Sequence, residues 1–330
     1  MLIHLLLSIL LWNPKLPQKT NPQLFEPNLI SELDAWSFTP AFSKDGNRLL
    51  YVRWDNPNYN LGDRSIQRLY TSTKANGQWT EPVAIAETAG HRVDWPHFSP
   101  DGKHFLLSYN KYHAGQYNYP NEQKWSDFDI WRADCDTAGN IDWSSFEPIR
   151  EADINREKTP ANARIRYVYN ETSPRMDLEG NLYFWSERPD QGIGRRDIYV
   201  APASGSGVED WQATQLLPRP INSTFRESGV AIAPDGQWMI FSSRRTGGQG
   251  KEDLYFSRKE GQNWTTPINL GPQVNSNEHD YCPQISPDGK TLYFTSSRKI
   301  KDVAPLDPGE GELVYNAIYF IPVDRIEAIQ

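Results

Sequence analysis

The chain has 330 residues and a net charge of −8 at pH 7, with 12 Trp, 16 Tyr, 13 Phe, 25 Pro and 22 Gly. The acidic balance and the lack of a long basic run exclude the electrostatic footprint of a nucleic-acid-binding protein. The length could accommodate two domains, but all-β propellers and barrels of this size are commonly a single domain.

The N-terminal residues 1–12 (MLIHLLLSILLW) form an apolar run of signal-peptide length that is too short to span a bilayer as a helix. The run lacks a basic segment before it and a clear cleavage site after it. We interpret it as a secretory signal, with a short membrane anchor or an incorrectly assigned start as alternatives. Residues 13–24 are rich in Pro and Asn and indicate a linker, and residues 25–330 are expected to form one domain that is periplasmic or secreted.

A short pattern repeats five times along the rest of the chain. Each copy has a strand, a tight turn of an acidic residue followed by Gly, and a second strand of alternating residues. The turn acids are Asp45, Asp101, Glu179, Asp235 and Asp288, at intervals of 56, 78, 56 and 53 residues. Five residues before each acid stands Pro40, Pro96, Pro174, Val230 or Pro283. A repeat of this period, with turns and aromatics and no helical periodicity, predicts a β-propeller.

Two further strands complete each repeat. The third contains an Asp-Ile/Leu-aromatic pattern, at Asp129, Asp197 and Asp253, and the fourth opens with a tryptophan. The last repeat stops after its third strand, at 318–323, whereas residues 25–29 (FEPNL) resemble a fourth strand with no blade of their own. We therefore predict an all-β fold with five four-stranded antiparallel blades, closed by the N-terminal strand completing the last blade. A sixth, degenerate blade within the 78-residue interval is the alternative.

The run SPDGKTLYFTSSR at 286–298 and the Asp-Leu-Tyr strand at 253–255 resemble the WD-like repeats of TolB-like β-propellers. The resemblance covers residues 25–323. It implies the architecture and little about function, because such repeats occur in periplasmic scaffolds, in envelope proteins and as gates on peptidases.

The connections differ in length on the two predicted faces. Turns between strands one and two, and between strands three and four, are short. Long connections join strands two and three, or strand four and the next blade: 54–68, 110–128, 154–171, 188–196, 244–252 and 298–316. All long connections should emerge on one face, which we call the long-loop face. Binding residues concentrate on loops held by a rigid scaffold, so we expect function there.

Acidic residues recur at the start of the innermost strands on that face. Glu171, Glu227 and Asp280 stand eight residues before their turn acids, and Asp94 stands seven before its own. We expect them near the mouth of the central channel. They are the candidate catalytic residues if the protein is an enzyme; the alternative is that they cap loops or pair with neighbouring arginines.

Further candidates for ligand binding lie in the same loops: His91, Arg226, Glu278, His279, His113, Tyr117, Arg298 and Asp129. Salt bridges Arg188–Asp197 and Arg244–Asp253 are expected across the loop bases. Arg298 and Asp129 lack the corresponding partners, Ala317 and Asn110 standing in their place. Their unmatched charges are therefore predicted to meet a ligand.

Catalytic, phosphate-binding and metal-binding sequence motifs are missing, so no cofactor and no metal is expected. We favour a non-catalytic, TolB-like propeller that binds a protein, peptide or glycan on the long-loop face. The alternative is a glycan-active enzyme, a glycoside hydrolase or polysaccharide lyase, since glycoside cleavage requires a pair of carboxyl groups. A regulatory subunit of a separate enzyme is a third hypothesis. We expect a monomer with no nucleic-acid partner and no membrane span beyond the N-terminal segment.

Overall fold

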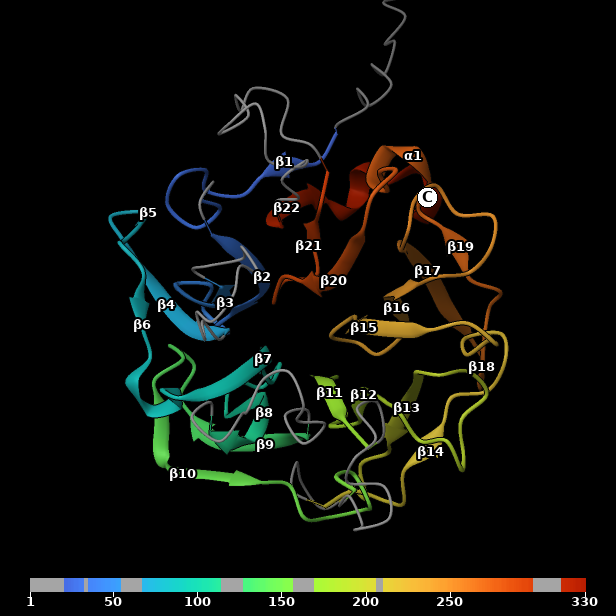
Figure 1. The fold of residues 1–330 in the computed structure, drawn as a ribbon, viewed down its shortest axis with the longest axis horizontal. Coiled ribbons are helices and arrows are strands. Elements are labelled where there is room, and N and C mark those ends of the chain that lie inside the picture. Colours follow the sequence, from blue (N-terminus) through green and yellow to red (C-terminus); the bar gives the residue numbers. More distant parts are fainter. Residues whose placement is uncertain are drawn as a thin grey trace, which may run out of the picture.

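Five antiparallel sheets stand as blades around a central axis in the computed structural model of the chain (Figure 1). The structure describes residues 21–32, 35–54, 67–113, 127–156, 169–205, 210–298 and 316–330, with the side chains of 111–113 left aside. The prediction of a five-bladed propeller is confirmed, and the predicted signal segment lies outside the described residues. No helix among the described residues is long and apolar enough to cross a bilayer.

The blades follow one another along the chain, and each has its first strand nearest the axis (Figure 1). Blade one contains β2 (Trp36–Phe42), β3 (Arg48–Trp54), β4 (Arg68–Ala75), β5 (Gln78–Trp79) and β6 (Val83–Ala84). Blade two contains β7 (His91–Phe98), β8 (His104–His113), β9 (Phe128–Cys135) and β10 (Ile141–Pro148). Blade three contains β11 (Glu171–Met176), β12 (Leu182–Ser186), β13 (Asp197–Ala201) and β14 (Gln215–Leu216).

Blade four contains β15 (Glu227–Ile232), β16 (Trp238–Ser243), β17 (Asp253–Glu260), β18 (Asn263–Trp264) and β19 (Ile268–Asn269). Blade five contains β20 (Asp280–Ile285), β21 (Thr291–Ser296), β22 (Ala317–Pro322) and β1 (Gln23–Leu24). The described helices are one turn each: η1 (Ala86–Thr88), α1 (Gly271–Val274), η3 (Val323–Arg325) and η4 (Glu327–Ile329).

The two ends of the described chain close the ring in one sheet. β1 pairs with β22, and the Phe25 amide then donates to the Ile318 carbonyl at 2.8 Å. The Phe25 ring is 6% exposed and packs edge-on against Phe42, Tyr293 and Phe320. The predicted strand exchange is confirmed, with pairing that starts two residues earlier than residue 25. It satisfies the outer edge of blade five and buries a large ring.

A β-bulge interrupts the innermost strand of every blade. The residue six positions before the turn acid has a positive φ in all five: Thr39, Trp95, Ser173, Gly229 and Cys282, with φ of 51° to 60°. The regular spacing of the prolines is explained here, because proline follows this residue in four blades. The inner edge of the strand has no neighbour at the axis, so the missing proline N–H breaks no ladder bond.

The bulges turn side chains toward the axis. A Cβ built on Gly229 would lie 2.8 Å from Cη2 of Trp95. Trp95 belongs to blade two and Gly229 to blade four, so the indole reaches across the axis and narrows the channel.

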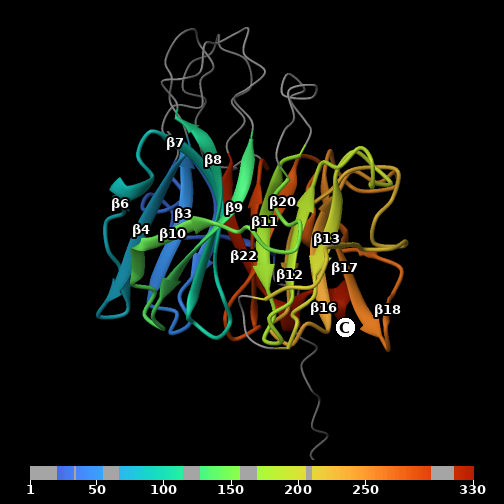
Figure 2. The ribbon, with the colours of Figure 1, turned by 90° about the horizontal axis from the view of Figure 1, so that it is seen from below.

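The two faces differ as expected in the described part of the chain. Antiparallel pairing puts the end of each second strand and the start of each third strand at the same face, opposite the C-terminus (Figure 2). The connections at 188–196 and 244–252 lie there, while the Asp-Gly turns lie at the other face. Most of the other long connections fall outside the described residues.

Candidate functional site

Three of the candidate acids form a repeated internal motif rather than a channel lining. Glu171, Glu227 and Asp280 are each the first residue of an innermost strand, and each is 0% exposed. Each forms an ion pair with an arginine that follows the second strand of the same blade. The nearest nitrogen–oxygen distances are 3.5 Å for Arg188–Glu171, 3.3 Å for Arg245–Glu227 and 2.7 Å for Arg298–Asp280.

The three arginines are held in equivalent surroundings. Each lies over a Phe of the second strand and a Tyr of the third, as Arg188 does over Phe184 at 5.5 Å and Tyr199 at 4.8 Å. Each also donates to a carbonyl of the connection from the preceding blade: Ile154 for Arg188, Ile221 for Arg245 and Val274 for Arg298. Each acid accepts a backbone N–H from that same connection. The motif therefore ties neighbouring blades together.

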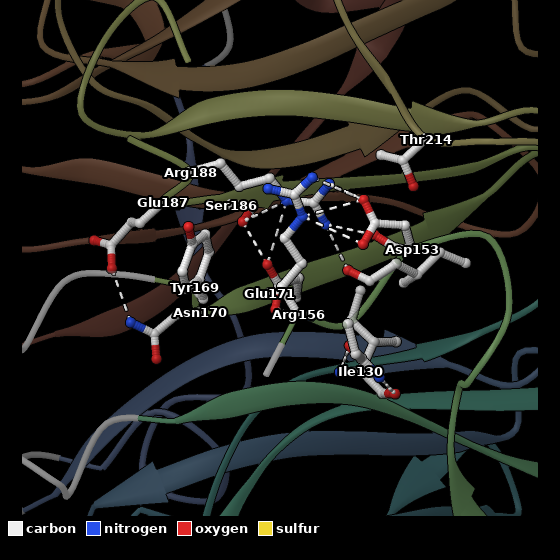
Figure 3. A network of polar contacts seen from close by, with 12 residues as sticks. Ile130, Asp153, Arg156, Tyr169, Asn170, Glu171, Ser186, Glu187, Arg188 and Thr214 are labelled. Carbon is white, nitrogen blue, oxygen red and sulfur yellow. Dashed lines mark hydrogen bonds and ion pairs between the residues drawn. The ribbon is translucent and has the colours of Figure 1, made fainter. Parts of the chain in front are cut away.

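Figure 3 shows the Glu171 copy of this network. The Ser186 hydroxyl donates to Glu171 Oε1 at 2.6 Å, and Arg188 Nε donates to the same oxygen. Burial raises the pKa of Glu171 to about 7, although the Arg188 charge and the Ser186 hydrogen bond oppose that rise. The alternative interpretation of these acids, pairing with neighbouring arginines, describes their contacts.

The expected salt bridges across the loop bases are wrong. Asp197 accepts hydrogen bonds from the backbone N–H groups of Ile193 and Gly194, and Asp253 accepts them from Gln249 and Gly250. The short aspartate side chain satisfies its own loop before it can reach an arginine. The paired arginine of blade four is Arg245, one residue after the expected Arg244.

Arg298 is likewise not unmatched, because it pairs with Asp280 instead of a third-strand residue. Asp129 also has interaction partners, and its charge contributes to the raised pKa of Glu171. The reasoning that selected these two residues as free charges therefore does not hold.

The sequence analysis missed an asparagine that belongs to the same motif. Asn155, Asn222 and Asn275 each follow the apolar residue whose carbonyl receives the arginine. The amide of Asn222 accepts from the Ile198 N–H at 2.7 Å and donates to the Ile198 carbonyl at 2.8 Å. Asn155 and Asn275 do the same with Ile130 and Leu254. The repeated apolar-Asn pair was the available signal.

Two glycine loops fold back against the next blade. Both follow the spacing Gly-x-Gly-x-x-Asp, at 192–197 and 248–253. A Cβ on Gly194 would collide with the Phe225 carbonyl oxygen, so only glycine permits this approach. The loops form isolated parallel bridges, Arg196 with Arg226 and Glu252 with His279. The residue before the aspartate is thereby brought to the axis.

A cavity of about 480 Å³ lies on the axis at the long-loop face. Two repeated positions supply much of its wall. Nine residues before the turn acids stand Trp36, Arg92, Asn170 and His279, and immediately before the third-strand position shared with Asp197 stand Phe128, Arg196, Glu252 and Asn316. Trp95 and Cys282, at the bulges, also contribute. Other lining residues are Asp94, Thr172, Trp185, Glu187, Ser228, Ser242, Arg244, Tyr281 and Ser297.

Two carboxyl groups in this cavity have opposite pKa shifts. Burial raises the pKa of Asp94 to about 6, against the opposing charge of Arg92. Burial also acts to raise the pKa of Glu252, but the His279 and Arg244 side chains outweigh it and lower the pKa to about 2. Arg244 Nε donates to Glu252 Oε2 at 3.0 Å. Glu252 is therefore ionised at any ordinary pH, whereas Asp94 titrates near pH 6.

The remaining candidate residues are distributed unevenly. Asp94 and His279 line the cavity. His91 instead stacks on Tyr109 at 4.7 Å and lies 3.0 Å from the Asn110 carbonyl oxygen through Nδ1. Glu278 pairs with Lys251 at 2.6 Å on the rim. The His113 side chain and Tyr117 lie outside the described residues.

The charged residues that line the cavity were largely missed from sequence. Arg92, Arg196, Glu187 and Glu252 were not singled out as site residues. Their signal was positional, since a repeat that closes into a ring brings equivalent positions of every blade to one place.

No protein-family model and no curated protein matches the chain. Among solved structures, the fold is similar to that of a BT0996 complex with RGII, with a TM-score of 0.55 and 9% identity over 93% of this protein and 91% of that one. A structure described as "Glycoside hydrolase" has a TM-score of 0.53 and 11% identity over 88% of both proteins. TolB from Acinetobacter baumannii has a TM-score of 0.42 and 16% identity over 79% of this protein and 49% of that one, so the chain spans about half of TolB. At these identities the similarity extends to the propeller fold.

Proposed function

We propose that the chain is a non-catalytic, TolB-like propeller, secreted or periplasmic, that binds a protein segment, peptide or glycan in its central cavity. One observation carries this proposal: the long-loop face holds a cavity of about 480 Å³ lined by arginines, carboxylates and aromatic rings. That volume lies within the usual range for ligand sites, roughly 300 to 1,000 Å³. The wall is built on strand ends, so the charged groups are fixed before a ligand arrives.

The contacts of the repeated acids favour binding over catalysis. A general acid or base must lie within hydrogen-bond reach of the group that it protonates or deprotonates. Glu171, Glu227 and Asp280 are fully buried, and none of them is among the cavity-lining residues. Their arginine partners and backbone donors account for them as structural groups.

A second candidate function depends on a different carboxyl pair. Asp94 and Glu252 line the same cavity, and their pKa values of about 6 and about 2 are pushed apart. Such a separation is typical of a proton donor and an ionised partner in glycan-cleaving enzymes. A glycan hydrolase or lyase that uses Asp94 and Glu252 is therefore the alternative.

The test is a glycan and peptide array probed with the full-length protein, together with a hydrolysis screen on every ligand that binds. Arg244→Ala changes an exposed cavity residue, and Glu260→Gln on the opposite face is the control. Binding that Arg244→Ala weakens, without turnover, supports the binding protein. Turnover that Asp94→Asn abolishes supports the enzyme. A protein that binds nothing on either array contradicts both.

A further inference from the structure

Four arginines gather where blades three and four meet at the cavity rim. Arg195 and Arg196 precede β13, Arg226 precedes β15 and Arg244 follows β16. Their backbones are directly joined: Arg196 bridges Arg226, and the Arg244 N–H donates to the Arg226 carbonyl at 3.2 Å. In a protein with a net charge of −8, this concentration of positive charge is a local feature.

Two of these arginines already have carboxylate partners. Arg196 Nε lies 2.8 Å from Glu187 Oε1, and its guanidinium lies 4.4 Å from the centre of the Trp185 ring. Arg244 pairs with Glu252 at 3.0 Å. These contacts fix the two guanidinium groups on the cavity wall.

Arg226 is different, because its side chain makes no hydrogen bond or ion pair with any part of the chain that the structure describes. Burial, together with the charges of Arg196, Arg195 and Arg244, lowers the pKa of Arg226. A guanidinium held among like charges without a partner is an unsatisfied donor of up to five N–H groups. An anionic group placed there would relieve the repulsion and accept those donors.

The repeat shows where Arg226 lies. It is the ninth residue before Asp235, the position that in the other four blades is occupied by Trp36, Arg92, Asn170 and His279. All four line the cavity. Ring symmetry therefore puts the start of the Arg226 side chain at the cavity rim, next to Arg196 and Arg244.

We propose, on the basis of the binding function above, that the ligand is an acidic glycan whose sugar carboxylate is held by Arg226, flanked by Arg196 and Arg244. Arginine binds carboxylates through two parallel hydrogen bonds, which suits a fixed carboxylate on a sugar ring. Asn170 and Asn316 supply amides nearby, and Trp36 and Tyr281 supply half-buried rings. A folded protein partner would instead need about 800 Å² of surface on each side, which a concave site of this size does not present.

The experiment compares a trimer of galacturonic acid with the matched trimer of galactose, which carries CH₂OH in place of each carboxylate. A glutamate-rich peptide is the third probe, and all three are titrated into the full-length protein by calorimetry. We expect the uronate to bind and the galactose trimer to bind about 10- to 100-fold more weakly, as the loss of a charge-assisted hydrogen bond predicts. Arg226→Ala should weaken uronate binding by the same factor, and Arg226→Lys by less.

Arg258→Ala is the matched control, because Arg258 is 65% exposed at the far end of β17 and should leave binding unchanged. Thermal unfolding of each variant establishes that it is folded. Equal binding of both trimers with no effect of Arg226→Ala would overturn the acidic-glycan inference and leave the binding function intact. Binding of the acidic peptide alone would also overturn it. Failure of all three probes would overturn the inference, whereas the array result decides the proposed function separately.

Discussion

Replacing Glu227 with alanine separates a structural role for the repeated acids from a catalytic one. Glu227 accepts hydrogen bonds from the Ser223 N–H, the Ser223 hydroxyl and the Ser243 hydroxyl at 2.9, 2.6 and 2.9 Å, and from Arg245 at 3.3 Å. The substitution leaves all of these donors without their acceptor. The Arg245 side chain is only 15% exposed, so water cannot fully replace the carboxylate.

The expected loss follows from that geometry. Removing one member of a buried ion pair costs about 3 to 5 kcal/mol, because the remaining charge stays buried and unpaired. An unfolding entropy of about 2.1 cal/mol/K per residue gives roughly 0.7 kcal/mol/K for this chain. Each kcal/mol therefore lowers Tm by about 1.4 °C, and Glu227→Ala should lower it by about 4 to 7 °C.

Thermal and urea unfolding followed by tryptophan fluorescence measure this change. The control is Glu260→Ala, an exposed glutamate at 67%, which should change the free energy of unfolding by less than about 0.5 kcal/mol. The double variant Glu227→Gln/Arg245→Met removes both charges and should recover part of the loss. If Glu227→Ala were as stable as wild type and abolished turnover on a bound glycan, the structural account of these acids would be refuted.

Three further predictions concern the ring, the rim and the cavity. Phe25→Ala should lower the free energy of unfolding by about 3 to 5 kcal/mol in urea, because it removes a buried ring from the closing strand; a loss under about 1 kcal/mol would mean that closure does not depend on this packing. Gly194→Ala forces a Cβ against the Phe225 carbonyl, so it should destabilise by about 1 to 3 kcal/mol and speed amide exchange in 192–197, a result that unchanged exchange would contradict. The pKa of Asp94 is raised from 3.8 to about 6, so the folded protein holds a proton there that the unfolded chain has released. The stability from Asp94 is present below pH 3.8 and lost as pH rises through about 6. Asp94→Asn should remove that component from urea midpoints measured across this range, and an identical pH profile in both proteins would be the contrary result.

The architecture was readable because it depends on short-range chemistry that repeats. An acidic residue followed by Gly dictates a tight turn wherever it stands, and the glycines of all five turns have a positive φ. Five copies of one turn with one strand pattern leave few folds open, and the unpaired segment after residue 24 indicated how the ring closes. The prolines before each turn were also visible, although their reason, a bulge at the axis, emerged only from the backbone.

The site was readable only in part, because it depends on which residues meet across blades. Arg188 and Asp197 are nine residues apart and looked like partners, yet each found a nearer one: Glu171 for the arginine and the loop N–H groups for the aspartate. Arg196 and Glu252 stood in loops without any motif of their own. They became cavity residues because glycine allows each loop to touch the next blade.

The amino-acid sequence by itself determined the five blades, the exchange of strands between the chain ends and the face that carries the long loops. These features follow from local turn chemistry and from a period that is visible in one dimension. Only the tertiary structure decided that three of the acids are sealed against arginines and that other charges surround the cavity. The reason is that ion pairing depends on distance and burial in three dimensions, and closing the ring brings together side chains that lie up to about 280 positions apart.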